Sequence, residues 1–304
     1  MASDVAETET EPVPADTPSA KVVPVAPAPT PDPETAEVSV NDVSFRYPGG
    51  VETLSHLNLV VPPATTVSIV GPSGCGKSTL LSLIGGLMRP TTGTVARRPA
   101  AADRLAVAMV FQKDTLLPWM KVRDQVALHF RFRRRRRADV KAWVESLLEL
   151  AGLEEFGDAY PYQLSGGMRR RVAFLTAVAA LPQVLLLDEP FSSLDEPTRL
   201  AIHQDVFDIT REFGITTVLV THDLAEAISL SDEVTILTRR PATVAARHVM
   251  PFGSDRNLVG LRERSDFLAL YGELWRELSG QLDVAPSHRK RASGAVAHPF
   301  RTKP

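Results

Sequence analysis

The chain has 304 residues, of which 44% are hydrophobic, and its formal net charge is -2. This length allows one large domain or two small ones, and the near-neutral charge gives no reason to expect nucleic acid as a partner. The single cysteine, Cys75, excludes an internal disulfide framework and fits a reducing cytosol. No apolar run approaches the roughly 20 residues that span a bilayer. The N-terminus is acidic and unlike a signal peptide, so we expect a cytosolic chain, or one bound to a membrane only through a partner.

The first part of the chain predicts a tail followed by strands. Residues 1–36 are rich in Ala, Pro, Thr, Glu and Val without periodicity, which predicts a disordered acidic tail. Order should begin near Val38 with a β-rich stretch to Phe45, followed by an alternating strand from Leu57 to Val61. A further apolar strand runs from Val67 to Val70 and leads into a glycine-rich loop.

The rest of the chain alternates strands with helices. A strand is predicted from Leu105 to Phe111, and a helical pattern from about residue 116 to 180, with Gly152 as a stop. Strand character returns at 184–187 and 216–220, each time before a helix, which predicts a parallel sheet and makes the helical stretch an insertion. After Pro251 we expect one or two amphipathic helices packed through Leu258, Leu261, Phe267, Leu268, Tyr271, Leu274, Trp275 and Leu278. A loose basic tail should follow from about residue 285.

Two motifs carry chemistry by themselves. The complete phosphate-binding loop, set between a strand and a helix, consists of Gly71, Pro72, Ser73, Gly74, Cys75, Gly76, Lys77, Ser78 and Thr79. Its backbone N–H groups and thiol-bearing turn should cradle the phosphates of a nucleoside triphosphate, with Lys77 as a mobile charge and Ser78 as a Mg²⁺ ligand. A plain strand-to-helix turn would not need this full motif. At the end of the apolar run 184–187, Asp188 is expected to hold Mg²⁺ through water and Glu189 to activate the attacking water. The alternative for this pair is an idle solvated turn, which the buried strand before it disfavours.

The segment Leu164-Ser165-Gly166-Gly167-Met168 makes a family resemblance specific. Together with the phosphate loop, Gln112, Asp188-Glu189, Ser193-Leu194-Asp195 and Thr221-His222-Asp223 in this order, it resembles the nucleotide-binding subunit of an ATP-binding cassette (ABC) transporter over about residues 38–280. The resemblance implies an α/β P-loop NTPase core with a parallel sheet, an antiparallel β subdomain and an inserted α-helical subdomain at about 116–180. The ATPase domain would cover 37–250, with a helical extension at 251–284 and the basic tail at 285–304.

The same resemblance assigns roles. It implies ATP and Mg²⁺ as cofactors, with Tyr47 stacking on adenine, His222 sensing the γ-phosphate, and Gln112 reaching Mg²⁺ and the attacking water. One chain already has a phosphate clamp, so the second glycine-rich loop, the second clamp, would serve the ATP of an opposite subunit, with Ser165 and Gly167 at its γ-phosphate. Gly166 and Asp195 are also expected to bind nucleotide. Because this chain carries both halves of the composite site, we expect a homodimer with ATP at its interface.

The stretch from Phe111 to Val126, with Leu116-Leu117-Pro118-Trp119 inside it, resembles the branch that imports nitrate, aliphatic sulfonates or taurine. This implies permease subunits as partners, an external solute-binding protein, and a place on the cytoplasmic face of the cell membrane. Local core packing is the alternative for Leu116–Trp119.

The part after Pro251 is too short for the regulatory domain of sugar importers. A non-transport ABC ATPase of DNA repair, translation or iron–sulfur assembly is the alternative function, and a P-loop kinase would leave Leu164–Met168 unexplained.

Two residues depart from the family pattern, and a run of arginines allows a second interpretation. Thr176 and Arg170 stand where the family usually has Arg and Gln, which bears on turnover and subunit contacts. The run Arg133 to Arg137, preceded by Arg131, could neutralise nucleic-acid phosphates. It has few interleaved aromatics, and we interpret it as a solvated or membrane-facing basic patch.

Overall fold

A computed structural model of the protein describes residues 37–99, 104–113, 115–132, 136–192, 194–253 and 256–282. The predicted tails at 1–36 and 285–304 lie outside the described residues, as do residues 133–135 of the arginine run and Ser193. No helix within the described ranges is long and apolar enough to cross a membrane.

The larger sheet has six strands among the described residues, in the order β5-β6-β7-β3-β8-β9. The strands are β3 (Thr66–Val70), β5 (Leu105–Val110), β6 (Pro182–Asp188), β7 (Thr216–Val220), β8 (Glu233–Leu237) and β9 (Val244–Val249). Neighbouring strands are parallel except for the antiparallel pair β8 and β9. The predicted parallel sheet is therefore confirmed, and β8 and β9 extend it beyond the predicted strands.

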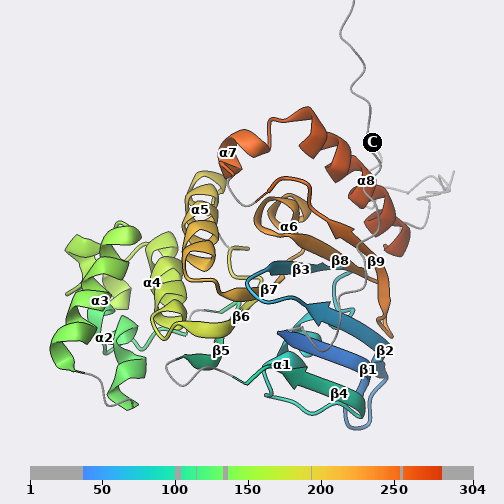
Figure 1. Cartoon of the computed structure of the whole chain (residues 1–304), viewed down its shortest axis with the longest axis horizontal. Coiled ribbons are helices and arrows are strands. Elements are labelled where there is room, and N and C mark those ends of the chain that lie inside the picture. Colours follow the sequence, from blue (N-terminus) through green and yellow to red (C-terminus); the bar gives the residue numbers. More distant parts are fainter. Residues whose placement is uncertain are drawn as a thin grey trace, which may run out of the picture.

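A smaller antiparallel sheet, in the order β2-β1-β4, packs against the larger one (Figure 1). It contains β1 (Val38–Arg46), β2 (Glu52–Val61) and β4 (Thr92–Arg97). The first two were predicted from their apolar alternation. Strand β4 was not, because only Val95 of its side chains packs against the core.

Successive side chains of β6 point to opposite faces of the large sheet and pack in two separate hydrophobic clusters. Leu185 and Leu187 belong to the cluster formed with α4, α5, α6, α7 and α8, whereas Val184 and Leu186 pack with α1 and the small sheet. Figure 1 shows α5, α6, α7 and α8 on one side of the sheet, and α1 with the small sheet on the other. Both faces are covered, as expected for a parallel sheet.

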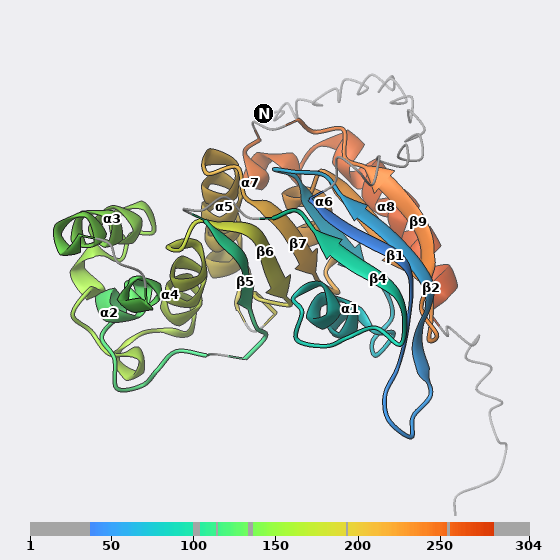
Figure 2. The ribbon, with the colours of Figure 1, turned by 60° about the horizontal axis from the view of Figure 1, so that its bottom comes forward.

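The helices fall into three groups. Three of them, α1 (Lys77–Ile84), α5 (Glu196–Glu212) and α6 (Leu224–Leu230), follow strands of the large sheet. The predicted insertion is helical: α2 (Val122–Val126), α3 (Arg137–Leu150) and α4 (Gly166–Val178), with 3-10 turns η1 (Leu128–Phe132), η2 (Glu154–Phe156) and η3 (Pro161–Gln163). It lies beside the edge strand β5 (Figure 2).

Two helices, α7 (Leu258–Leu261) and α8 (Ser265–Gln281), follow Pro251 as predicted. Their buried residues are Leu258, Leu261, Phe267, Leu270, Leu274 and Leu278. The prediction was wrong for Leu268 and Trp275, which are 59% and 46% exposed. They lie on the outward face of α8, since the core takes only one stripe of this helix.

Gly93 on β4 offers a test of how tightly the small sheet is built. Its φ is +80°, and a Cβ there would lie 2.2 Å from the Asp42 carbonyl oxygen. We expect Gly93→Ala to lower the free energy of unfolding by about 2 kcal/mol or more. Gly272→Ala is the control, because Gly272 is mid-helix in α8 with open space at its Cβ position, and it should stabilise by about 0.5–1 kcal/mol. Chemical denaturation of both variants measures this, and equal stability of the two would contradict the packing described.

Candidate functional site

The glycine-rich loop joins the end of β3 to the start of α1. Gly74 and Gly76 have φ of +71° and +124°, and a Cβ on Gly76 would lie 2.8 Å from Thr53 Cγ2. Only glycine fits this turn, which delivers the free amides of the first turn of α1 to the loop. Ser73, Gly74 and Ser78 are exposed. The loop is therefore built as a cradle for an anion.

Lys77 lies across the loop. Its Nζ donates hydrogen bonds to the carbonyl oxygens of Gly71, at 2.9 Å, and Pro72, at 3.1 Å. The side chain is only 6% exposed. Its positive charge is thus held over the loop by carbonyls that phosphate oxygens could replace.

Asp188 ends β6, and its carboxylate faces the first turn of α1. Ser78 Oγ donates to Asp188 Oδ1 at 2.9 Å. Burial raises the pKa of Asp188 above its ordinary value, and the neighbouring Glu189 charge raises it further, while the hydrogen bond from Ser78 and the charge of Lys77 lower it. A hydroxyl and a carboxylate oxygen at this distance are donors of the hard type that Mg²⁺ takes. The residues present fit that ion.

The Glu189 carboxylate lies where the carboxyl ends of β5, β6 and β7 come together. Its Oε2 accepts from Gln112 Nε2 at 3.3 Å and lies 3.1 Å from His222 Nδ1. Gln112 follows β5 and His222 follows β7, and these strands flank β6. The carboxyl ends of parallel strands are where open α/β sheets bind ligands. The structure therefore brings together Lys77, Ser78, Gln112, Asp188, Glu189 and His222, whose roles stay predictions.

Tyr47 stands beside the start of α1. Its hydroxyl lies 3.0 Å from Thr79 Oγ1, and its ring meets Phe45 edge-on with centroids 4.9 Å apart. The side chain is 43% exposed. An aromatic ring is thus anchored next to the phosphate loop with a surface left open.

The second glycine-rich segment lies elsewhere. Ser165 Oγ caps α4 by accepting from the Met168 amide at 3.2 Å, and Gly166 and Gly167 form the first turn. In both Figure 1 and Figure 2, α4 lies on the other side of β5 and β6 from α1. The chain therefore does not bring Ser165, Gly166 and Gly167 to its own phosphate loop.

Asp195 belongs with this second segment. It caps α5, accepting from the Thr198 amide at 3.3 Å and from Thr198 Oγ1 at 3.0 Å, and these bonds lower its pKa. A Cβ added to Gly167 would lie 2.4 Å from Thr198 Cγ2. The N-termini of α4 and α5 are thus in contact, and only a residue without a side chain fits between them.

The Cys75 side chain is buried, and its expected place at the phosphates stays a prediction. The side chain is 2% exposed and packs in the core, with its Sγ near Gly71. Burial raises the pKa of the thiol, although the charge of Lys77 lowers it. The Cys75 amide donates to the Pro72 carbonyl oxygen at 3.2 Å.

Sequence reasoning missed the buried support behind His222. Glu226 on α6 accepts from Thr221 Oγ1 at 2.5 Å, and its other oxygen lies 3.3 Å from His203 Nε2. Glu226 and His203 are 4% and 0% exposed. The available signal was a glutamate on the apolar face of a short helix, where a polar residue needs a partner.

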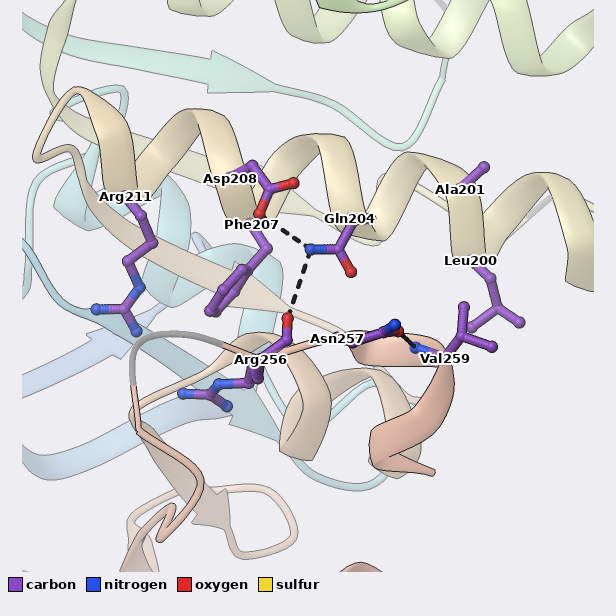
Figure 3. Close-up of a pocket in the computed structure, with 9 residues that line it drawn as sticks. All are labelled: Leu200, Ala201, Gln204, Phe207, Asp208, Arg211, Arg256, Asn257 and Val259. Atoms are coloured by element: carbon purple, nitrogen blue, oxygen red, sulfur yellow. Dashed lines mark hydrogen bonds between the residues drawn. The ribbon is translucent and has the colours of Figure 1, made fainter. Parts of the chain in front are cut away.

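A cavity of about 490 Å³ between α5 and α7 contains none of the predicted site residues (Figure 3). The Gln204 amide spans it, donating to Asp208 at 2.9 Å and accepting from the Leu258 amide at 3.0 Å. Arg256 stacks on Phe207, and burial lowers its pKa to about 10. These contacts hold α7 against α5, so the residues around the cavity have a structural role.

Comparisons with known proteins agree with this arrangement. The ABC transporter family model matches residues 54–192. The taurine import ATP-binding protein TauB of Jannaschia sp. (strain CCS1) is 31% identical over 264 residues, covering 82% of this chain and 98% of that protein. The solved dimeric structure of MJ0796, a bacterial ABC transporter cassette, matches with a TM-score of 0.62 and 31% identity over 70% of this chain and 98% of that one. The chain belongs to the ABC transporter family.

Two longer relatives are also similar. The sulfate/thiosulfate import ATP-binding protein CysA of Mycobacterium tuberculosis (strain ATCC 25618 / H37Rv) is 41% identical over 208 residues, covering 67% of this chain. The nitrate import ATP-binding protein NrtC of Synechococcus elongatus is 38% identical over 247 residues, covering 78% of this chain. The chain spans 59% of the length of CysA and 37% of that of NrtC.

The raised pKa of Asp188 predicts that this site residue lowers the stability of the fold when it is ionised. A carboxyl whose pKa is higher in the folded than in the unfolded state destabilises the fold when it is ionised. Asp188→Asn should therefore raise the melting temperature of the nucleotide-free protein at neutral pH. The gain should shrink as the pH falls through the pKa of Asp188, since the wild-type carboxyl is then protonated.

Asp195→Asn is the matched control for this experiment. The pKa of Asp195 is lowered, so its ionised form stabilises the fold and the substitution should not raise the melting temperature. Melting curves from pH 4 to 8 compare the two variants. A loss of stability in Asp188→Asn at neutral pH would show that burial does not dominate at this carboxylate.

Proposed function

We propose that the chain is the ATP-hydrolysing subunit of an ABC importer. The observation that carries this is the meeting of Gln112 and His222 on the Glu189 carboxylate, next to the Ser78–Asp188 pair. Such a group of side chains can bind a triphosphate and place a water for attack on its last phosphorus atom. The import ATP-binding names of its relatives support the same activity.

The residues would divide the work by position. The backbone amides of residues 71–79 and the Lys77 charge hold the phosphates, and Tyr47 stacks on the adenine. Glu189 accepts the proton of the attacking water, which Gln112 orients. His222, whose Nδ1 already faces Glu189, contacts the γ-phosphate. Ser78, Asp188 and Gln112 would hold Mg²⁺, which neutralises charge on the phosphates when bound.

The second clamp supports a homodimer. Ser165, Gly166, Gly167 and Asp195 lie together at the N-termini of α4 and α5, and α4 packs on the opposite face of β6 from α1, which follows the phosphate loop. A second copy packed head to tail would bring them to its own bound ATP, giving two equal sites. A cassette in the same family is described as dimeric, which supports this arrangement.

The segment Leu116–Trp119 would receive the permease. Trp119 is 71% exposed, while the Leu117 amide is fixed by Gln125 Oε1 at 2.8 Å and Leu116 packs in part against the core. One rigid turn thus presents an exposed aromatic side chain close in sequence to Gln112. Movement at the nucleotide could reach a membrane partner by this route.

The solute would be a small anion. Relatives carry names for import of taurine, nitrate and sulfate, all of which are anions or zwitterions with an acidic group. An external solute-binding protein and a place at the cytoplasmic face of the membrane belong to the same proposal. A non-transport ABC ATPase is less well supported, because these relatives are import proteins.

The proposal predicts the behaviour of Glu189→Gln. The amide keeps the shape of the side chain but cannot accept the proton, so hydrolysis should fall by about a hundredfold or more while ATP still binds. ATP should then hold the variant as a dimer, which light scattering with Mg-ATP measures. A variant that binds ATP but stays monomeric at every concentration would remove the head-to-tail dimer from the proposal.

Replacing Leu117 and Trp119 by Ser should separate hydrolysis from transport. The isolated subunit should keep its basal ATPase rate within about twofold, because neither side chain lies at the nucleotide. Solute uptake with the permease should be lost. Val259→Ser, also at an exposed apolar side chain but on α7, is the control and should leave uptake unchanged. Wild-type uptake by the double variant would make Leu116–Trp119 incidental surface.

A further inference from the structure

Arg170 is a buried arginine that the proposed chemistry does not use. It lies on α4 and is 6% exposed. Its guanidinium donates through Nη1 to the Phe111 carbonyl oxygen at 3.1 Å, and through Nη2 to the carbonyl oxygen of Gln112. Burying a guanidinium is costly unless its N–H groups are bonded, and the fork of an arginine suits two adjacent carbonyls. The contact therefore fixes the chain where it leaves β5.

This contact decides where the side chain of Gln112 can reach. Gln112 is exposed and donates to Glu189 at 3.3 Å, so few neighbours hold its side chain. Its backbone, in contrast, is held by Arg170. A shift of the Gln112 carbonyl would move the side-chain amide away from Glu189, because both belong to one residue.

The other end of the contact is the helix that carries the second clamp. Ser165 caps α4, and Arg169 Nη1 donates back to the Leu164 carbonyl oxygen at 2.8 Å, which fastens the segment to the helix. Arg171 joins α4 to Asp205 of α5 at 3.1 Å. The first turns of α4 and the second clamp therefore move as one body.

We propose that Arg170 is a positioning residue that links the second clamp to Gln112. When the clamp closes on the ATP of an opposite subunit, α4 moves, and Arg170 carries that movement to the Gln112 of its own site. The two nucleotide sites of the dimer are thereby coupled. This inference rests on the proposed ATPase dimer and deepens it.

Arg170→Met tests the link, because methionine fills much of the space but donates no hydrogen bond. We expect kcat for ATP hydrolysis to fall about tenfold, with KM for ATP changed by less than about twofold. Arg170→Lys keeps the charge but lacks the fork, and should fall between Arg170→Met and the wild type. Arg256→Lys is the control, because Arg256 is also a buried arginine bonded to two carbonyl oxygens, those of Ser229 and Ser231, and it has no part in the link; it should keep the wild-type kcat.

Hydrogen exchange gives a readout besides activity. In the Glu189→Gln background, Mg-ATP should protect both the loop peptide 70–80 and the peptide 111–120 from exchange. With Arg170→Met added, protection of 70–80 should remain and protection of 111–120 should be lost. A role in fold stability alone would lower both together, and that result would overturn the proposal.

The remaining outcomes are equally decisive. Wild-type kcat and wild-type protection of 111–120 in Arg170→Met would overturn the link. If Arg170→Met does not fold, Arg170→Lys decides: a folded protein with reduced kcat and intact protection of 70–80 supports the link, and wild-type values overturn it. Absence of ATP protection at 70–80 in the Glu189→Gln parent would instead refute the proposed function, and the link with it.

Discussion

The burial of β6 on both faces is the constraint on which the site depends. Val184 to Leu187 are at most 1% exposed, so the strand cannot shift without opening one of the two cores. Its end is therefore a fixed point, and Asp188 and Glu189 follow directly. Glu189 takes a φ of +43° and its amide donates to the Val220 carbonyl oxygen at 2.8 Å. The surrounding sheet holds this strained turn, which aims the carboxylate at Gln112 and His222.

Much of this could be predicted where the sequence carries local signals. The phosphate loop, β6 and the helices after Pro251 have strong apolar patterns or fixed glycine spacing, and they were found at their places. Strand β4 is mostly exposed and therefore has no apolar pattern, whereas the buried β8 has one in Val234, Ile236 and Leu237 that was not recognised. The helical insertion was placed, but its boundaries as a domain remain a prediction.

Three side chains whose direction the sequence does not reveal share a cause. Cys75 lies in a motif that binds phosphate, yet its thiol points into the core beside Leu237. Trp275 and Leu268 follow an apolar pattern on α8 but lie outside its buried stripe. Sequence motifs and apolar periodicity determine which segment forms a helix, a strand or a loop. The direction of an individual side chain follows from the packing of neighbours that are distant in sequence.

The supports behind the site are polar, buried and distant in sequence, which is why no local pattern reveals them. Glu226 holds Thr221, and Thr221 Oγ1 accepts from the Asp223 amide at 2.9 Å, so the turn that contains His222 is bonded on both sides. Arg170 does the same for the turn that contains Gln112. Each group that meets Glu189 is thus exposed itself but fixed by a buried polar partner. An exposed side chain on a rigid backbone can change ligands without losing its place, which a site that binds and releases nucleotide requires.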